Sequence, residues 1–354
     1  MRRVGAHLLF LAPLIACAGE QSTRSAAATA APVAPPAVRL VGRFDAQDPM
    51  GPRFAWSASG VVARFRGTQL DVRLRDAGTN VFQVVVDGSP KAALATSPTK
   101  ELYSVAMGLA EGEHEVMLLK RTEARVGEVQ FLGFVQPLLV PPPVPKRRIE
   151  FIGDSITAGY GNEGANEHCR FSATTENAYM TYAALTARAL SAEHAAVAWS
   201  GKTIDGISEI YDRALPTRPE SRWDARAWIP DVVVVNLGTN DVTRGDQQFP
   251  FVQSYVKLLD RVRAQYPKAL LVCAVGPMLT DTYPAGKQTL TRARAYVHAA
   301  VTAKKKAGDD RVIFIEFPVQ DASNGYGCDY HPSLRTHQIM AERLTTALKT
   351  ELGW

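Results

Sequence analysis

The stretch RRIEFIGDSITAGYGN, residues 147–162, decides the fold of the longer part of the chain. Its apolar run at 149–152 predicts a buried β-strand that ends in the turn Gly153-Asp154-Ser155. A side chain just beyond the end of a strand lies at the edge of the sheet, where open α/β sheets bind ligands. Ser155 is therefore a candidate nucleophile if a base lies near it. Gly-Asp-Ser is also a common turn composition, so the motif needs support from the rest of the chain.

Strand and helix patterns alternate from this stretch to the C-terminus. We expect strands at 149–152, 195–199, 231–237, 269–275 and 312–316, and helices at 176–191, 251–265, 287–307 and 334–351. The β-branched run at 232–235 is typical of a parallel strand that is covered on both faces. Met340, Leu344 and Leu348 recur every four residues and predict a buried helical stripe. The predicted fold is an α/β doubly wound parallel sheet, whose functional loops gather at the carboxyl ends of the strands.

Groups that acyl transfer requires follow four of these strands. They are Ser155, Ser200-Gly201-Lys202-Thr203, Gly238-Thr239-Asn240-Asp241 and Cys328-Asp329-Tyr330-His331-Pro332. Together they offer a nucleophile, a base and donors for an oxyanion. Each has a plain structural alternative, since His331-Pro332 can start a helix, Asn240-Asp241 can cap one and Gly201 can form a turn. Their occurrence together after four strand ends favours catalysis.

The blocks GDSI, SGKT, GTND and DYHP resemble those of the SGNH, or GDSL-like, hydrolases over residues 148–354. An N-terminal β domain with HEVMLLKRTEA, followed by GDSITAGYGNEG and GCDYHPS, is similar to carbohydrate esterase family 2 over residues 38–354. This resemblance implies a jelly-roll domain before a flavodoxin-like three-layer catalytic domain. It also implies a serine esterase that hydrolyses O-acetyl groups of plant-type polysaccharides, xylan or glucomannan, through an acetyl-enzyme intermediate.

The resemblance assigns roles to individual residues. Ser155 matches the nucleophile and His331 the general base. The backbone N–H groups of Ser155 and Gly201 and the side-chain amide of Asn240 match the oxyanion hole. A glycine lets the backbone approach the carbonyl closely, and an asparagine supplies a neutral donor. Asp154 is expected to support the nucleophile turn by hydrogen bonding.

The acid and the substrate contacts are less well specified. The wider superfamily has an aspartate three residues before the histidine, where this chain has Cys328, and Asp329 stands two before His331. We expect Asp329 to orient His331 through Nδ1, as in members of family 2, of which some use a backbone carbonyl instead. Trp199 and Tyr330 flank the catalytic groups and are candidates to stack on a sugar ring, although Trp199 can equally be a core residue.

Residues 38–136 show strand patterns and little helix. Leu70, Val72 and Leu74 alternate with polar residues, the run at 81–86 ends in the hairpin signal Asp87-Gly88, and a third strand lies within 113–121. These patterns predict a β-sandwich or jelly roll that ends near residue 136. We consider two roles for this domain, carbohydrate binding and packing beside the active site. No row of exposed aromatic side chains is evident in its sequence, and this favours the packing role. The proline-rich segment 137–147 is expected to be a stiff connector.

The N-terminus indicates export. Residues 1–17 combine Arg2 and Arg3 with a short apolar run and end in Leu-Ile-Ala-Cys, which resembles the lipobox of bacterial lipoproteins. Cys17 would carry the lipid, and the alternative is an ordinary secretory signal. No aspartate follows Cys17, so we expect an outer-membrane lipoprotein or a secreted protein of the bacterial cell envelope. Residues 18–37, rich in Ala, Ser, Thr and Pro, are expected to form a flexible linker.

Charge and cysteine content limit the partners. The formal net charge of the 354 residues is +5, and the sequence has no basic run, so we expect no nucleic-acid partner. We expect contact with the membrane only through the lipid anchor. Cys169 and Cys328 lie in loops at the same edge of the predicted sheet, and we expect a disulfide between them, the alternative being two free thiols. Cys273 lies in an apolar strand and should be a buried free thiol. No motif for a metal or a cofactor is present.

The sequence leaves two rival functions open. One is another SGNH activity, on a lipid, a thioester or the O-acetyl groups of peptidoglycan. The other is a non-catalytic, carbohydrate-binding surface protein, against which the intact set Ser155, Gly201, Asn240 and His331 argues.

Overall fold

The computed structural model describes residues 37–243 and 248–354, together with Met1, and only the backbone of residue 249. Apart from Met1, the predicted signal segment with its Cys17 lies outside the described residues, as does almost all of the predicted linker. The chain divides into a unit of residues 1–35 and a compact unit of residues 36–354, which contains all of the helices and strands described.

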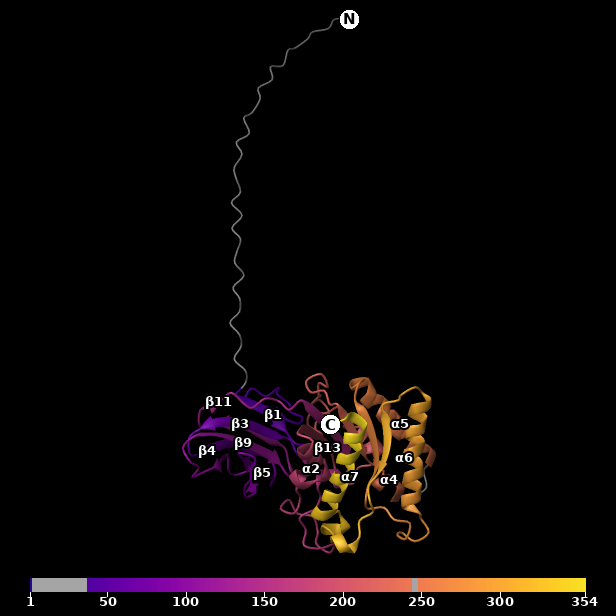
Figure 1. The fold of residues 1–354 in the computed structure, drawn as a ribbon. Coiled ribbons are helices and arrows are strands. Elements are labelled where there is room, and N and C mark those ends of the chain that lie inside the picture. The colour runs from indigo at the N-terminus through magenta and orange to yellow at the C-terminus, as the bar shows by residue number, and fades with distance from the viewer. Residues whose placement is uncertain (2–36, 244–247) are drawn as a thin grey trace. The chain divides into compact units, whose positions relative to one another are not determined.

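Two antiparallel sheets form a β-sandwich in the first part of this unit (Figure 1). The strands are β1 (Val38–Val41), β2 (Arg53–Phe54), β3 (Gly60–Arg66), β4 (Leu70–Asp76), β5 (Val81–Val86), β6 (Ser89–Pro90), β7 (Leu94–Ala95), β8 (Leu102–Ala106), β9 (Glu113–Lys120), β10 (Val129–Phe134) and β11 (Leu138–Leu139). One sheet has the order β1-β3-β9-β5-β6, with β11 on β3 and β7 on β5, and the other has the order β2-β10-β4-β8. Inward side chains such as Phe65, Leu74 and Phe82 fill the space between the sheets.

The strands confirm the predicted hairpin at Asp87-Gly88 but place the start of the connector later than predicted. Asp87 and Gly88 both have positive φ, 50° and 76°, as a two-residue hairpin turn requires, so the predicted hairpin is present. The predicted connector begins too early, because Leu138 and Leu139 pair with Phe65 and Arg64 of β3. These leucines are half-buried, and their apolar side chains gain more by packing on the sandwich than by extending into solvent.

A five-stranded parallel sheet forms the second part, which we call the α/β domain. Its strands are β12 (Arg147–Gly153), β13 (Ala192–Ala198), β14 (Val232–Asn236), β15 (Leu270–Val275) and β16 (Val312–Glu316). They lie in the order β13-β12-β14-β15-β16, with every neighbouring pair parallel. The strand order reverses between β12 and β14, and ligands bind at the carboxyl ends of strands at such a switch point. The predicted doubly wound parallel sheet is confirmed.

Helices cover both faces of this sheet (Figure 1). They are α1 (Ser155–Ala158), α2 (Tyr182–Ala189), α3 (Ile204–Ser208), α4 (Thr239–Thr243), α5 (Gln248–Gln265), α6 (Thr289–Lys306) and α7 (Leu334–Leu352), with the short 3-10 helices η1 (Ala124–Val126), η2 (Ala178–Met180), η3 (Ala322–Asn324) and η4 (Cys328–Tyr330). Helices α2 and α7 pack on one face and α3, α5 and α6 on the other. In the described part of the chain, no helix is long and apolar enough to cross a membrane.

The helix predicted at 176–191 is shorter than expected. Asn177 caps η2 by accepting a hydrogen bond from the N–H of Tyr179, and the extended backbone of Thr181 (φ −72°, ψ 160°) separates η2 from α2. Thr181 then caps α2 by accepting from the N–H of Ala184. Two successive caps therefore break a segment whose apolar pattern favours one continuous helix.

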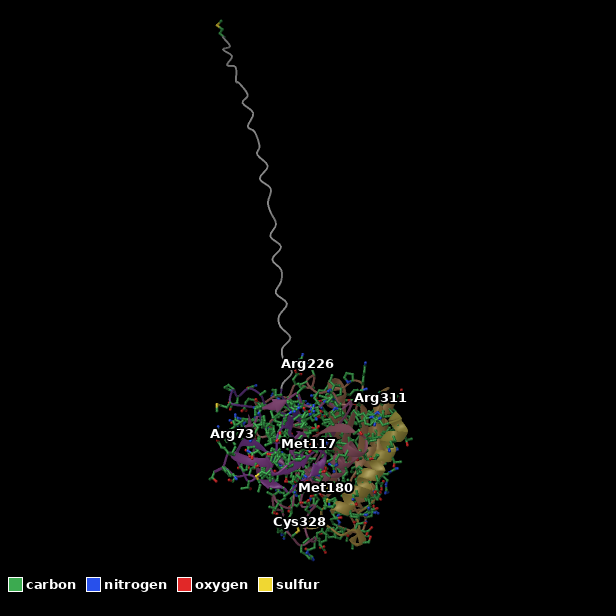
Figure 2. The ribbon with its side chains drawn as sticks, turned by 60° about the vertical axis from the view of Figure 1, so that its left-hand side comes forward. Arg73, Met117, Met180, Arg226, Arg311 and Cys328 are labelled. Carbon is green, nitrogen blue, oxygen red and sulfur yellow. A yellow bond between two sulfur atoms is a disulfide. The ribbon has the colours of Figure 1, made fainter. Side chains whose placement is uncertain are left out.

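The functional loops gather at one end of the parallel sheet. Figure 2 labels Cys328, which follows β16 in the chain, near the bottom of the folded unit, and Arg311, which directly precedes β16, at its upper right. The β-sandwich packs beside this sheet through Arg43, whose buried guanidinium donates to the Glu150 carboxylate at 2.8 Å. The loops after β12 and β13 also meet the β-sandwich, because Arg121 pairs with Glu163 and Glu123 accepts a hydrogen bond from the N–H of Ser200.

Candidate active site

Ser155 and His331 meet at the carboxyl end of the parallel sheet. Ser155 is the first residue of α1, directly after β12, and Asp154 caps this helix by accepting from the N–H of Ile156 at 3.0 Å. His331 follows η4, beyond β16. Its Nε2 lies 2.8 Å from Ser155 Oγ, which is hydrogen-bonding distance for a base and its nucleophile. The two predicted partners, 176 positions apart in the chain, are brought together by the fold.

The other side of the His331 ring faces backbone oxygens. Nδ1 lies 3.1 Å from the carbonyl of Cys328 and 3.2 Å from the carbonyl of Asp329. A carbonyl only accepts, so Nδ1 carries the proton and donates it. Nε2 then presents its lone pair to the hydroxyl of Ser155, the arrangement that a general base requires. The ring of Tyr160 stacks on the imidazole at a centroid distance of 4.1 Å and fixes its plane.

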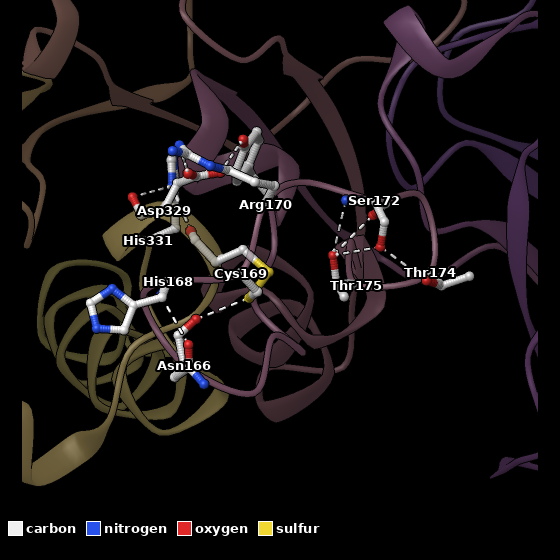
Figure 3. Close-up of a disulfide and its surroundings, with 11 residues drawn as sticks. Asn166, His168, Cys169, Arg170, Ser172, Thr174, Thr175, Asp329 and His331 are labelled. Atoms are coloured by element: carbon white, nitrogen blue, oxygen red, sulfur yellow. Dashed lines mark hydrogen bonds and ion pairs between the residues drawn. A yellow bond between two sulfur atoms is a disulfide. The ribbon is translucent and has the colours of Figure 1, made fainter.

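The prediction that the Asp329 carboxylate orients His331 is wrong. Its two oxygens accept hydrogen bonds from Tyr160 Oη at 2.8 Å and from Arg170 at 2.7 Å (Figure 3). The cause is the backbone of Asp329, which has the left-handed angles φ 53° and ψ 39° and turns its carbonyl, instead of its side chain, toward the imidazole. Asp329 therefore acts on His331 through its main chain and, through Tyr160, from the face of the ring.

We expect Asp329→Asn to keep kcat within about fivefold of the wild type. The carbonyl that faces Nδ1 remains, and an exposed ion pair such as Arg170–Asp329 is worth about 0–1 kcal/mol. A carboxylate that orients the base of a triad would instead cost about 10⁴-fold when changed to the amide. Turnover of an activated acetate ester decides between the two, and a loss of 10²-fold or more would restore Asp329 as the acid.

His331 is neutral at physiological pH. Burial lowers the pKa of His331 to about 4, although the carbonyls that accept from its ring act in the opposite direction. Burial also raises the pKa of Asp154, beside the nucleophile, to about 7. A neutral imidazole accepts the proton of Ser155 without first losing one of its own.

The pH profile should show this low pKa directly. Protonated His331 cannot act as the base, so activity is lost as the pH falls through about 4. We expect kcat/KM for a neutral acetate ester to stay level from pH 7 down to about 5 and then to fall about tenfold per pH unit below the pKa. Short assays with a return to pH 7 separate this effect from unfolding. An acid limb centred near 6.5 would contradict it.

The predicted oxyanion donors lie in two loops that touch each other. Gly201 is part of a turn after β13, closed by a hydrogen bond from Lys202 N to Trp199 O at 3.3 Å, and its φ is 77°. Asn240, in α4 after β14, donates from Nδ2 to the carbonyl of Lys202 at 3.0 Å. The same Nδ2 lies 3.4 Å from a carboxylate oxygen of Asp154, the neighbour of the nucleophile. Asn240 therefore lies beside the residue that precedes the nucleophile, and the turn that contains Gly201 is joined to Asn240 through Lys202. The role of both donors on an oxyanion stays a prediction.

The two aromatic candidates occupy different surroundings. Trp199 is half-buried and packs against Ala55 and Ala124 of the first part of the unit and against Leu215. This packing favours the alternative prediction of a core residue, and a contact of Trp199 with substrate stays untested. Tyr330 is 55% exposed and lines a groove of about 740 Å³ beside the active site. Its position suits a contact with an extended ligand.

A disulfide joins Cys169 to Cys328, and Cys273 is a buried free thiol. Figure 3 shows this bridge next to Asp329 and His331. The N–H of Asp329 also donates to the carbonyl of Cys169 at 3.0 Å. The loop after Ser155 therefore holds the backbone of the residues that face His331 Nδ1.

Sequence reasoning missed the residues that surround these loops from the β-sandwich side. The guanidinium of Arg125 lies 3.9 Å from the ring centroid of Phe171 and 5.3 Å from that of Tyr160. Glu123 is fully buried and accepts a hydrogen bond from the N–H of Ser200. The sequence contained one signal for them. Residues 120–123 form a polar run directly after an apolar strand, at a place where polar side chains are expected to face solvent. Across the described residues, no group of three His, Cys, Asp or Glu is arranged to hold a metal ion.

Comparison with known proteins places the chain in a family. Residues 40–143 match the N-terminal domain of carbohydrate esterase 2, and residues 151–339 match the GDSL-like Lipase/Acylhydrolase family. The chain is 46% identical over 334 residues to the cellulase/esterase CelE of Acetivibrio thermocellus. The aligned region covers 90% of this chain but only 40% of CelE. It is 30% identical over 343 residues to an acetylxylan esterase/glucomannan deacetylase of Cellvibrio japonicus, covering 89% of this chain and 90% of that protein.

Solved structures give the same result. A family two carbohydrate esterase from Clostridium thermocellum, in complex with cellohexaose, is similar with a TM-score of 0.85 and 45% identity over 90% of this chain and 99% of that one. A family 2 enzyme from Corynascus thermopiles is similar with a TM-score of 0.82 and 31% identity, over 90% of this chain and 100% of that one. The chain belongs to carbohydrate esterase family 2, with a GDSL-like hydrolase domain after the family's N-terminal domain.

Proposed function

We propose that the protein is a serine esterase that removes O-acetyl groups from plant-type polysaccharides, xylan or glucomannan. The observation that carries this proposal is the 2.8 Å contact between Ser155 Oγ and His331 Nε2, with Nδ1 held by backbone carbonyls. Relatives named as acetylxylan esterase/glucomannan deacetylase support the substrate class.

The reaction begins with transfer of the Ser155 proton to His331 Nε2. Ser155 Oγ attacks the acetyl carbonyl, and the resulting imidazolium is stabilised by its hydrogen bonds to the carbonyls of Cys328 and Asp329. The negative charge on the former carbonyl oxygen is stabilised by N–H donors, for which Ser155, Gly201 and Asn240 are the candidates. His331 then gives its proton to the sugar oxygen, which leaves as a hydroxyl group.

The second half of the reaction uses the same residues. The acetyl group is now an ester of Ser155, and its hydrolysis needs an activated water. His331, neutral again, takes a proton from that water, which attacks the acetyl carbonyl. Collapse of the second tetrahedral intermediate returns the proton to Ser155 and releases acetate.

The groove of about 740 Å³ fits a polysaccharide chain beside this centre. It is lined by residues of the loops after β15 and β16, with Tyr283, Tyr326 and Tyr330 among them. Tyr283 and Tyr330 expose 80% and 55% of their surfaces, although large aromatic side chains favour burial. Flat exposed rings offer faces on which sugar rings stack, and an open groove admits a polymer that a closed pocket would exclude.

Tyr283→Ala should weaken the binding of polymer and leave the chemistry intact. Loss of one aromatic contact is worth about 0.5–1.5 kcal/mol, which corresponds to a rise in KM for acetylated glucomannan of about 2- to 12-fold. With a small acetate ester, which does not reach along the groove, KM and kcat should stay within about twofold. Equal effects on both substrates would show that Tyr283 does not contact the polymer.

One experiment separates the proposed function from its rivals. The purified protein is given acetylated xylan, acetylated glucomannan, O-acetylated peptidoglycan and esters of longer acyl chains, and the released acids are measured. Acetate from the plant-type polymers supports the proposal. Preference for long acyl esters or for peptidoglycan would assign another hydrolase activity, and carbohydrate binding without hydrolysis would indicate a non-catalytic surface protein.

We further propose that the protein is exported and anchored through a lipid on Cys17, or secreted. The apolar segment before Cys17 and the Ala-, Ser-, Thr- and Pro-rich linker after it support this localisation. The Cys169–Cys328 disulfide also fits an oxidising compartment. The intact mass of protein isolated from its own host tests the anchor, since the proposal requires cleavage before Cys17 and an added lipid mass.

A further inference from the structure

We propose that Glu123, which the β-sandwich contributes from the segment after β9, is a positioning residue for the oxyanion donors of the α/β domain. The inference rests on the proposed function, because it concerns the same reaction. It gives the N-terminal domain a part in catalysis beyond packing. Glu123 lies between β9 and η1, within the segment Lys120–Arg125, and the proposal follows from the contacts of this segment.

The carboxylate of Glu123 holds the start of the oxyanion loop. Its Oε2 accepts a hydrogen bond of 2.7 Å from the N–H of Ser200, and its Oε1 pairs with Arg125 Nε at 2.6 Å. The side chain has no exposed surface. A carboxylate that is shielded from water binds an N–H group more strongly than a neutral oxygen acceptor does. The peptide group of Ser200 is therefore held firmly in place.

This contact fixes a turn that reaches both candidate donors. The turn runs from Trp199 to Lys202, and its Trp199 side chain packs against Ala124, the neighbour of Glu123. Gly201, the next residue after Ser200, supplies one candidate donor. Lys202 ends the turn, and its carbonyl accepts from Asn240 Nδ2 at 3.0 Å. A shift of the turn would therefore displace the Gly201 N–H and the Asn240 amide together.

The surroundings of Glu123 hold it in one position. Its N–H donates to a carboxylate oxygen of Glu176 at 2.9 Å, and Lys120 Nζ donates to the carbonyls of Thr122 at 2.8 Å and Glu123 at 3.0 Å. Lys120, Glu123 and Glu176 are all fully buried. Replacing buried ionic groups by apolar ones is often neutral or stabilising, so stability alone does not account for this cluster. A fixed geometry for the neighbouring loop does account for it.

The same segment also reaches the base. Arg125, paired with Glu123, places its guanidinium over Phe171 and near Tyr160, and Tyr160 stacks on the His331 imidazole. The segment Lys120–Arg125 therefore touches the supports of the oxyanion donors on one side and of the base on the other.

The test compares Glu123→Ala and Glu123→Gln with a matched control, Glu193→Ala. Like Glu123, Glu193 is a buried carboxylate at the contact between the β-sandwich and the α/β domain, where it binds Arg39 and the Trp228 indole. It lies near the amino end of β13, whereas Ser200 follows the carboxyl end of that strand. We expect Glu123→Ala to lower kcat about 10²-fold with KM within about twofold, the size of effect that a small displacement of catalytic groups produces. Glu123→Gln keeps an oxygen acceptor for Ser200 and should recover about tenfold of that loss. Glu193→Ala should lower the melting temperature and leave kcat within about twofold.

A second pair of variants decides the question if Glu123→Ala does not fold. Glu123→Asp keeps the charge but shortens the reach to Ser200, so we expect it to have a lower kcat than Glu123→Gln. The inference is overturned if Glu123→Asp is as active as Glu123→Gln or better, or if folded Glu123→Ala keeps kcat within about threefold of the wild type. A wild type without turnover on any acetyl ester would remove the proposed function itself, and the inference with it.

Discussion

His331→Ala is expected to lower kcat on an activated acetate ester by about 10⁴- to 10⁶-fold. In serine hydrolases the loss of the base costs about as much as the loss of the whole catalytic set, because the groups act as a unit. His331 is placed for this role by its 2.8 Å contact with Ser155 Oγ and by the backbone carbonyls that hold its tautomer. A Ser155→Ala/His331→Ala double variant should therefore be no slower than either single variant.

His194→Ala is the matched control for this change. His194 is also buried, and burial lowers its pKa to about 3, but it lies near the amino end of β13. We expect the control to lose stability and to keep kcat near the wild-type value. A loss of less than about tenfold in folded His331→Ala would show that another group accepts the proton of Ser155.

Asn240→Ala is expected to lower kcat by about 10²- to 10³-fold, with KM nearly unchanged. Loss of one oxyanion donor typically costs about 2.7–4 kcal/mol of barrier. The carbonyl of Lys202 holds the amide of Asn240 at 3.0 Å, so this donor is in place before substrate binds. It strengthens its interaction only as charge develops on the acetyl oxygen, and the effect therefore falls on kcat.

Asn324→Ala provides the comparison. Asn324 is half-buried like Asn240 and lies in η3, where its amide donates to Asp321 at 3.4 Å. Its replacement should leave both kcat and KM within about twofold. If Asn240→Ala raised KM and spared kcat, Asn240 would be a binding residue and the oxyanion hole would need another donor.

Much of the fold could be predicted because apolar patterns determine it. The β-branched run of β14 and the stripe Met340, Leu344 and Leu348 of α7 are buried as their spacing predicts. Once the strands are parallel, the loops after them must meet at one edge of the sheet, and this places Ser155 and His331 together. The pairing of Cys169 with Cys328 follows from the same geometry.

The remaining features depend on details that residue spacing does not contain. The left-handed backbone of Asp329 decides that its carbonyl, and not its carboxylate, faces His331. The contact of Glu123 with Ser200 joins segments 77 positions apart, from two differently folded parts of the chain. A pattern within one segment cannot reveal either feature, because both arise from packing between segments.

The most direct measurement is acetate release from acetylated xylan and acetylated glucomannan by the wild type and by Ser155→Ala. We predict release by the wild type and a rate at least about 10⁴-fold lower for the variant, which keeps the fold and the groove but lacks the nucleophile. The ratio between the polymers would then define the preferred substrate. Release by folded Ser155→Ala at a rate near that of the wild type would contradict Ser155 as the nucleophile, and no release by the wild type would contradict the proposed reaction.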